Sequence, residues 1–364
     1  MQSYYYRPIP HVLFCLVFGF GFVSKADFEI YLKDTNRIPL YAQQTSYWCG
    51  AGAGQMTLEG FPDDVNYSYA QKAVWDEIQK YKVEQGWYAD PDGLKGALAQ
   101  LGKDSHWEAT CAKTRDAITR LTIDGMYMGK FPVPVLVYGH AHWVVVIGAT
   151  LEEHPMMSMV LKLKTIEAHD PWEAQHVLVS GEAWLKKYWN ETGGSGKWGN
   201  CYVAVHEVEA RKKSLLAGMK IVTEKQPTDG SAISPDLALT KAKAYLTQIT
   251  KERPAFKDLS DGFLFDPMLV THENGNYYLV PVGKKKNGES LGAVMVNAYS
   301  GAWEGLSLFQ KPLRYRKQKQ QGQWVFYPSE ESRSPFHPVY QTAKSYVDLD
   351  GKVSSELHEL GRGN

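Results

Sequence analysis

Two kinds of hydrophobic spacing alternate along residues 27–210, and together they predict a mixture of helices and strands. Among four segments, Tyr69–Tyr81 and Asp92–Leu101 carry apolar residues at the spacing of one helix face, and Gly50–Leu58 is rich in small residues and compatible with a helix. In four other segments apolar and β-branched residues form short runs, which is typical of buried strands. The predicted helices are Gly50–Leu58, Tyr69–Tyr81, Asp92–Leu101 and Thr114–Tyr127, and the predicted strands are Pro134–Tyr138, His142–Ala149, Met159–Ile166 and Tyr202–Val208. Because helices precede strands, we expect an α+β fold with a helical part packed on an antiparallel sheet.

A different pattern follows the segment Lys225–Pro235, whose serine, threonine, proline and glycine residues are typical of a linker. Ser234 and Pro235 predict a helix start, because serine caps helices well and proline fits the first helical position. Asn274-Gly275 and Asn287-Gly288 predict two-residue hairpin turns. The extended runs beside these turns are Met268–Thr271, Tyr277–Val282 and Leu291–Asn297. We therefore expect a small accessory α+β module made of one helix and hairpins.

The amino terminus has the pattern of a secretory signal peptide. Arg7 precedes the uncharged apolar run Val12–Val23, and this run ends in Ser24-Lys25-Ala26, a small-x-small sequence. The run is shorter than the roughly 20 apolar residues that a membrane span needs. We therefore expect export to the periplasm or the cell exterior, with no permanent membrane span. The expected organisation is a signal peptide at 1–26, a main domain at 27–210, a linker at 211–235, the accessory module at 236–327 and a tail at 328–364.

Composition excludes several classes of function. Lysine plus arginine and aspartate plus glutamate both number 40, so no net charge is available to hold nucleic acid or an anionic membrane surface. The sequence has no glycine-rich phosphate-binding loop, and we expect no nucleotide cofactor. Four cysteines without a Cys-x-x-Cys pair predict neither a zinc ribbon nor a thioredoxin-type site. Cys15 lies in the signal peptide, whereas Cys111 and Cys201 could pair in an exported protein, a question that the sequence leaves open.

Cys49 is the strongest candidate for a reactive side chain. It stands at the start of the predicted helix Gly50–Leu58, where backbone N–H groups and the helix dipole favour a thiolate. Gln43, six residues upstream, could donate an amide N–H to the oxygen of an acyl group on Cys49, and Gln44 could do so instead. With the Cys49 backbone N–H, either glutamine would complete an oxyanion hole. The segment therefore predicts acyl chemistry at a thiol.

A histidine and an aspartate further along the chain could complete a catalytic group. His142 heads an apolar predicted strand, from which its imidazole could accept the Cys49 proton and later return it. Asp170, in the sequence His169-Asp170-Pro171-Trp172, could hold the histidine in one tautomer. Trp172 could shield that histidine–aspartate contact from water.

In this order, these elements resemble papain-like cysteine peptidases, and most closely the branch related to bacteriocin leader-processing peptidases. The matching elements are the Gln-x5-Cys-Gly start, the stretch Leu94–Leu101, Pro132–Tyr138 leading into His142–Gly148, and Asp170-Pro171, within residues 37–208. The resemblance implies a papain-like fold and the hydrolysis of peptide bonds in peptides or proteins. It also implies that Gln43 stabilises the oxyanion, Cys49 is the nucleophile, His142 is the base and Asp170 orients it. That branch often sits on membrane transporters; because no such segment follows here, we expect a free exported hydrolase.

Other interpretations of the same residues compete with this one. The same acyl-enzyme could pass its acyl group to an amine, as a transglutaminase-like or transpeptidase-like acyl transferase does, or the fold could serve a non-catalytic binding protein. His140 could replace His142 as the base. His140, His142, His169 and Asp170 could instead be metal ligands, although this leaves Gln43 and Cys49 unexplained. The carboxy-terminal hairpins loosely resemble PepSY-like modules, which implies inhibition or substrate presentation; the alternative is an accessory module that only stabilises the fold.

Overall fold

The structure is a computed structural model, and it describes residues 27–31, 38–60, 68–102, 106–154, 160–207, 219–284, 288–315, 321–327, 334–349 and 351–355. The predicted signal peptide at 1–26 and Asn287 of the second predicted hairpin turn lie outside the described residues. The other predicted elements can be compared with the structure over most of their length.

The four predicted helices of the main domain are confirmed. They are α1 (Cys49–Glu59), α2 (Gln71–Tyr81), α3 (Pro91–Leu101) and α4 (Arg115–Asp124). Local capping explains two of the starts, because Asp90 accepts a hydrogen bond from the Gly93 N–H before α3 and Thr114 accepts one from the Ala117 N–H before α4. The other helical elements among the described residues are α5 (Gly181–Ala183), α7 (Pro235–Glu252), π-helical turns at Gly125–Gly129 and Trp184–Tyr188, and 3₁₀ turns at Gly196–Trp198 and Pro254–Leu259.

The strands of the described residues join into one curled, mixed sheet. In the amino-terminal half they are β1 (Phe28–Tyr31), β2 (Trp107–Ala112), β3 (Val133–Val137), β4 (His142–Leu151), β5 (Val160–Asp170), β6 (Gln175–Ser180), β7 (Tyr202–Glu207) and β8 (Lys220–Val222). In the carboxy-terminal half they are β9 (Phe263–Leu264), β10 (Met268–Thr271), β11 (Tyr277–Lys284), β12 (Glu289–Asn297), β13 (Trp303–Leu313), β14 (Gln323–Val325), β15 (Val339–Gln341), β16 (Tyr346–Val347) and β17 (Val353–Ser354). The α+β class is therefore confirmed.

The expectation of a purely antiparallel sheet is wrong. The central pairings β2–β7, β7–β3, β3–β4, β4–β5 and β5–β6 are antiparallel, but β8 runs parallel to β5 and β14 runs parallel to β10. Strand β8 lies inside the segment 211–235 that was expected to be a linker. Its Ile221 is buried between exposed Lys220 and Val222, and this alternation is typical of a strand at a sheet edge.

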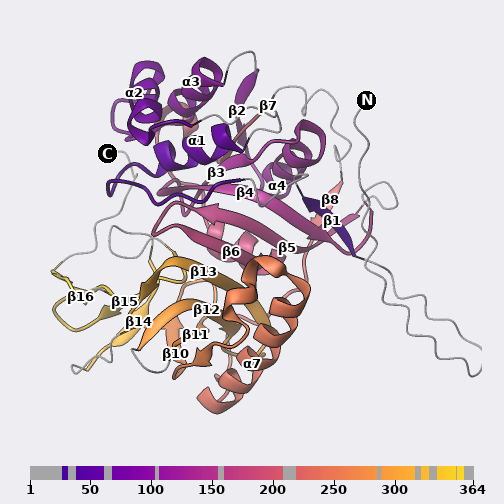
Figure 1. Ribbon diagram of the computed structural model, residues 1–364, viewed down its shortest axis with the longest axis vertical. Helices are drawn as coiled ribbons and strands as arrows, with labels where there is room; N and C mark the ends of the chain where they lie inside the picture. The colour runs from indigo at the N-terminus through magenta and orange to yellow at the C-terminus, as the bar shows by residue number, and fades with distance from the viewer. Residues whose placement is uncertain are drawn as a thin grey trace, which may run out of the picture.

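Small residues bring α1 close to the centre of the sheet. Figure 1 shows α1, α2 and α3 together over β3 and β4, while α7 covers the strands of the carboxy-terminal half. The first turns of α1 contain Gly50, Gly52 and Gly54, all of them buried. A Cβ atom on Gly50 would lie 2.5 Å from the Ala89 Cβ, so any larger residue would push the helix away from its neighbours. This close approach determines how near Cys49, the first residue of α1, lies to the sheet.

The carboxy-terminal half continues the same sheet. Strand β13 pairs antiparallel with β6, for example Phe309 with Gln175, so hydrogen bonds run without a break from one half to the other. The segment 328–364, expected to be a tail, contributes β15, β16 and β17 to the described structure. The two-domain division stays a prediction, but the halves share one sheet.

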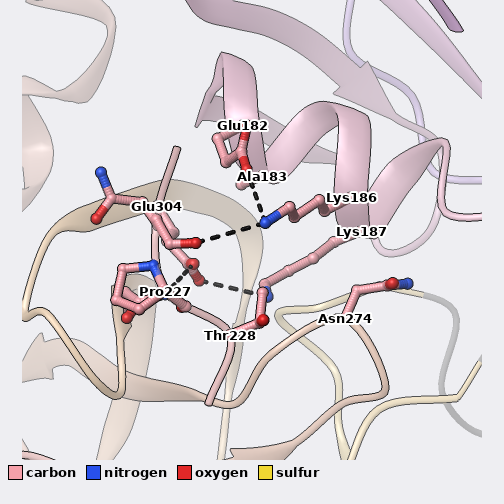
Figure 2. A pocket seen from close by; sticks show the side chains of 10 residues that line it. Glu182, Ala183, Lys186, Lys187, Pro227, Thr228, Asn274 and Glu304 are labelled. Atoms are coloured by element: carbon pink, nitrogen blue, oxygen red, sulfur yellow. Dashed lines mark hydrogen bonds and ion pairs between the residues drawn. The ribbon is translucent and has the colours of Figure 1, made fainter. Parts of the chain in front are cut away.

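A buried ion pair also joins the two halves. Lys187 is 2% exposed at its side chain, and its ammonium lies 3.5 Å from the Glu304 carboxylate of β13. It donates a hydrogen bond to the Gly275 carbonyl at 2.9 Å and lies 5.0 Å from the centre of the Tyr277 ring. Figure 2 shows this pair at a small polar pocket, which Asn274 also lines. Burial lowers the pKa of Lys187, and the Glu304 charge opposes that shift.

The two partners of this pair should contribute to stability in a coupled way, so that the losses caused by the two single substitutions do not add up in the double variant. We expect Lys187→Met or Glu304→Gln to lower the free energy of unfolding by about 3–5 kcal/mol, because each leaves a buried group without its partner. The double variant should lose clearly less than the sum. Denaturant titration checks this, with Lys164→Met, which breaks an exposed pair with Asp27, expected to change stability by less than about 1 kcal/mol. Strictly additive losses would contradict the coupling.

Candidate active site

Cys49 lies at the amino-terminal end of a buried helix. It is the first residue of α1 and is half-buried, and the preceding Trp48 makes no side-chain cap to the helix. The first turn carries no acidic residue that would oppose a thiolate. Helix amino termini stabilise anions through their backbone N–H groups and dipole. The local structure therefore favours a negatively charged sulfur at Cys49.

His142 and Asp170 form a buried pair beside this cysteine. The His142 Nε2 donates to the Asp170 Oδ1 at 2.7 Å, and each side chain is 1% exposed. Asp170 is held in turn by the Trp172 backbone N–H, which donates to Oδ1 at 2.8 Å. Cys49 lies close enough to His142 to favour the charged form of its ring, and Nδ1 is the ring nitrogen not engaged by Asp170. The structure therefore brings the three predicted residues together in the order Cys49, His142, Asp170.

Two opposing effects set the pKa of His142. Burial by itself would lower it, because the charged imidazolium is poorly solvated in the interior. The Asp170 charge and hydrogen bond, with a smaller contribution from Cys49, outweigh burial and raise the pKa to about 9. At neutral pH the ring is therefore an imidazolium, which can form an ion pair with a thiolate.

The strand order explains how His142 and Asp170 meet. Strands β4 and β5 are antiparallel neighbours, with Val145 opposite His169, so the start of β4 lies beside the end of β5. His142 begins β4 and Asp170 ends β5. Both residues therefore lie at the same edge of the sheet, and α1 brings Cys49 to that edge.

Gln43 lies in the loop before α1, and this loop is bonded to the residue that follows Asp170. Its backbone N–H donates to the Pro171 carbonyl at 2.8 Å, directly after Asp170. Its side-chain Nε2 donates to the Thr45 carbonyl at 2.7 Å, which engages one of its two N–H groups and leaves the other available as a donor. A Cβ atom on Gly52 would lie 2.9 Å from the Pro171 Cβ, so the first turn of α1 packs on this same loop.

Gln44 faces a different environment. Its backbone N–H donates to the Gln71 Oε1 at 2.7 Å, while its own side chain is exposed. Gln71 also donates to the Ala42 carbonyl at 3.2 Å and is 1% exposed, so it fixes the loop that carries both glutamines. Sequence reasoning missed Gln71. The available signal was its helical spacing from Val74 and Ile78, which places a polar side chain on the buried face of α2.

His140 bonds to a different part of the chain. Its Nε2 donates to the Cys201 carbonyl at 2.6 Å, and its ring centre lies 5.4 Å from that of Trp87. Burial lowers its pKa, which keeps the ring neutral. His140 has a φ of 75°, within the left-handed turn that connects β3 to β4. His142, not His140, therefore bonds to the carboxylate and has its pKa raised by Cys49.

The predicted alternative of a metal site is not supported by the placement of its ligands. The His169 Nδ1 donates to the Pro39 carbonyl at 3.1 Å, and the His169 ring packs against that of His176, with 4.9 Å between ring centres. Within the part of the chain that the structure describes, no three histidine, cysteine, aspartate or glutamate side chains are grouped to hold a metal ion.

The disulfide that the sequence left open is present. Cys111 of β2 is bonded to Cys201, which precedes β7, with 5.5 Å between their Cα atoms. The bond leaves Cys49 outside any disulfide among the described residues. Because the Cys201 carbonyl accepts the His140 hydrogen bond, the disulfide also anchors the turn that leads into His142.

Aromatic side chains gather next to Cys49. Tyr47 stacks on Tyr88 with 5.2 Å between ring centres, and Trp48 stacks on Trp75 at 5.5 Å. Tyr47 also contacts Trp75 edge-on at 5.5 Å, so the four rings form one group. Tyr47 and Tyr88 remain 38% and 48% exposed. An exposed apolar surface thus adjoins the residue before the thiol.

Comparison with protein-family models, with curated proteins and with solved structures finds no match to this chain. Among the described residues, no helix is both long and apolar enough to span a membrane.

The raised pKa of His142 makes a testable contribution to stability. A histidine whose pKa rises from 6.5 to about 9 on folding stabilises the fold fully below about pH 6.5, and the effect is lost as the pH rises through 9. We expect the stability advantage of wild type over Asp170→Asn to shrink across this range by on the order of 3 kcal/mol. Denaturant titrations at a series of pH values check this. His140→Asn should keep the wild-type dependence; a pH-independent difference for Asp170→Asn would contradict the assignment.

Proposed function

We propose that the chain is an exported cysteine peptidase with a papain-like fold, which hydrolyses peptide bonds through Cys49, His142 and Asp170. The observation that carries the proposal is the convergence of these side chains from three separate elements, α1, β4 and the end of β5. A helix packed on a sheet, with the cysteine on the helix and the histidine on the sheet, agrees with the fold that the sequence resemblance implies. The disulfide between Cys111 and Cys201 agrees with an oxidising compartment.

In this proposal each residue has a role in a two-step reaction. The Cys49 thiolate attacks the carbonyl carbon of the scissile bond, and the carbonyl oxygen becomes an oxyanion. His142 donates its proton to the leaving amine as the C–N bond breaks, which leaves a thioester on Cys49. A water molecule then gives a proton to His142 and attacks the thioester, which releases the acid and restores the thiolate–imidazolium pair. Asp170 keeps the ring oriented throughout without exchanging a proton itself.

Gln43 supports the oxyanion in this scheme. Its position is fixed by the backbone hydrogen bond to Pro171, and its remaining side-chain N–H is a donor beside the first turn of α1. With the backbone N–H of Cys49 it would stabilise the charge that develops in the transition state.

The aromatic group around Tyr47 and Trp48 suggests the kind of substrate. Aromatic rings bury large apolar area at low entropic cost, and they bind planar or aliphatic groups on their faces. We expect the enzyme to prefer peptides with an aromatic or bulky aliphatic side chain close to the scissile bond.

Cys49 should be the one hyper-reactive thiol of the protein. A limiting dose of iodoacetamide near neutral pH should add a single label, located by intact-mass measurement and peptide mapping to Cys49. Cys49→Ser should retain the fold but lose both labelling and peptide hydrolysis. A label on another residue would contradict the assignment. Hydrolysis retained by Cys49→Ser would exclude Cys49 as the nucleophile, and products that form only with an added amine would indicate an acyl transferase.

The two glutamines should differ strongly in their effect on turnover. Gln43→Ala should lower kcat by about 100- to 1,000-fold, because one oxyanion donor is lost. Gln44→Ala should stay within about threefold of wild type, since the exposed Gln44 side chain makes its fixing contact through the backbone. Steady-state kinetics on one peptide substrate compares them. A reversal of the two effects would move the oxyanion donor to Gln44.

A further inference from the structure

The turn that carries Asp170 has an unusual backbone. It connects β5 to β6 through residues 171–174, and both Glu173 and Ala174 have left-handed φ values, of 56° and 51°. Neither residue is glycine, so this conformation persists only if surrounding contacts hold it. The same turn supplies two contacts to the active site: the Trp172 N–H donates to Asp170, and the Pro171 carbonyl accepts from Gln43. Its geometry therefore affects both residues.

Gln175 holds this turn from within the sheet. It begins β6 directly opposite Asp170 in the β5–β6 register, and it is fully buried. Its side-chain Nε2 donates to the Trp172 carbonyl at 2.9 Å. Because Trp172 also donates its N–H to Asp170, one residue of the turn links the Gln175 amide to the catalytic carboxylate.

Within the described part of the chain, the other side-chain hydrogen bonds of Gln175 are made with the carboxy-terminal half. Its Nε2 donates to the His337 Nδ1 at 3.0 Å, and its Oε1 accepts from the Ser307 and Ser334 hydroxyls at 3.2 and 3.4 Å. Ser307 and Ser334 are completely buried and His337 is 6% exposed. A buried amide whose donors and acceptor are all satisfied has a single allowed orientation. The carboxy-terminal half thus sets the direction of the Gln175 side chain.

We propose that Gln175 is a positioning residue: it fixes the turn that carries Asp170, and the carboxy-terminal half holds Gln175 in place. On this view the carboxy-terminal half is part of the active-site scaffold rather than a separable inhibitor or a substrate-presenting module. The proposal rests on the function proposed above for its kinetic consequences, but not for its structural one.

The sheet supports the same conclusion independently of side chains. Phe309 of β13 pairs with Gln175, and the Gln310 N–H donates to the Ala174 carbonyl at 3.2 Å. Both ends of the left-handed pair in the turn are therefore tied down, one by the Gln175 amide and the other by the backbone of β13.

The experiment compares variants of the full chain. Gln175→Met keeps the side-chain size but removes the amide, and His337→Phe keeps a ring but removes the acceptor. His337→Asn restores an acceptor close to the position of Nδ1. Tyr277→Phe is the matched control, because it removes a buried hydrogen bond to the Pro335 carbonyl in the same segment without touching Gln175.

We expect Gln175→Met and His337→Phe to lower kcat by about 10- to 100-fold with little change in KM, since a displaced turn misorients the catalytic pair. NMR titration of the histidine rings should show the His142 pKa falling below its wild-type value near 9, because a misplaced Asp170 no longer opposes burial. His337→Asn should recover most of both quantities, and Tyr277→Phe should leave them at wild-type values even if it lowers stability.

Two results would overturn the inference. One is a wild-type kcat and His142 titration in Gln175→Met. The other is the same shift in Tyr277→Phe, which would mean that any loosening of the segment has this effect. If wild type neither hydrolyses peptides nor labels at Cys49, the proposed function fails, while the His142 titrations still decide whether Gln175 positions Asp170.

Discussion

The buried hydrogen bond between His142 and Asp170 is the contact on which the rest of the site depends. Burial alone would lower the pKa of His142, and the adjacent carboxylate is the main interaction that keeps the ring protonated. An imidazolium in this position needs an anion on its other side, and the first residue of α1 supplies a sulfur there. The close packing of the glycine-rich helix α1 against its neighbours brings that sulfur near the edge of the sheet where His142 lies. The proposed chemistry of the site thus depends on the positive charge of the buried His142 ring.

Holding that charge requires a rigid frame, and the frame extends over both halves of the chain. The sheet is continuous through β6 and β13, and the Lys187–Glu304 pair joins the halves at a second place. Buried polar groups of this kind contribute little net stability but penalise every arrangement in which they are unpaired. They therefore favour one relative placement of the two halves. That placement also determines the environment of the Asp170 turn.

The sequence predicted the local parts of this arrangement and missed the long-range ones. Cys49 and His142 could be proposed because one begins a predicted helix and the other heads a buried strand, whereas Gln43 and Asp170 were proposed from their spacing and order in the family resemblance. Strand β8 was missed because three residues give too short an alternation, and β13 because Gly305 and polar residues interrupt its apolar pattern. The role of Gln175 depends on Ser307 and His337, more than 130 residues away, and no local pattern encodes such a contact.

The most direct test of the account measures the charge on Cys49. Thiolates absorb in the ultraviolet where thiols do not, so the difference spectrum between wild type and Cys49→Ser, followed against pH, reports the ionisation of this one sulfur. The account predicts a full thiolate signal at about pH 7, well below the ordinary thiol pKa of about 8.5, and loss of that signal in His142→Ala. A Cys49 that ionises only near pH 8.5, with the same curve in His142→Ala, would contradict the ion pair and the mechanism built on it.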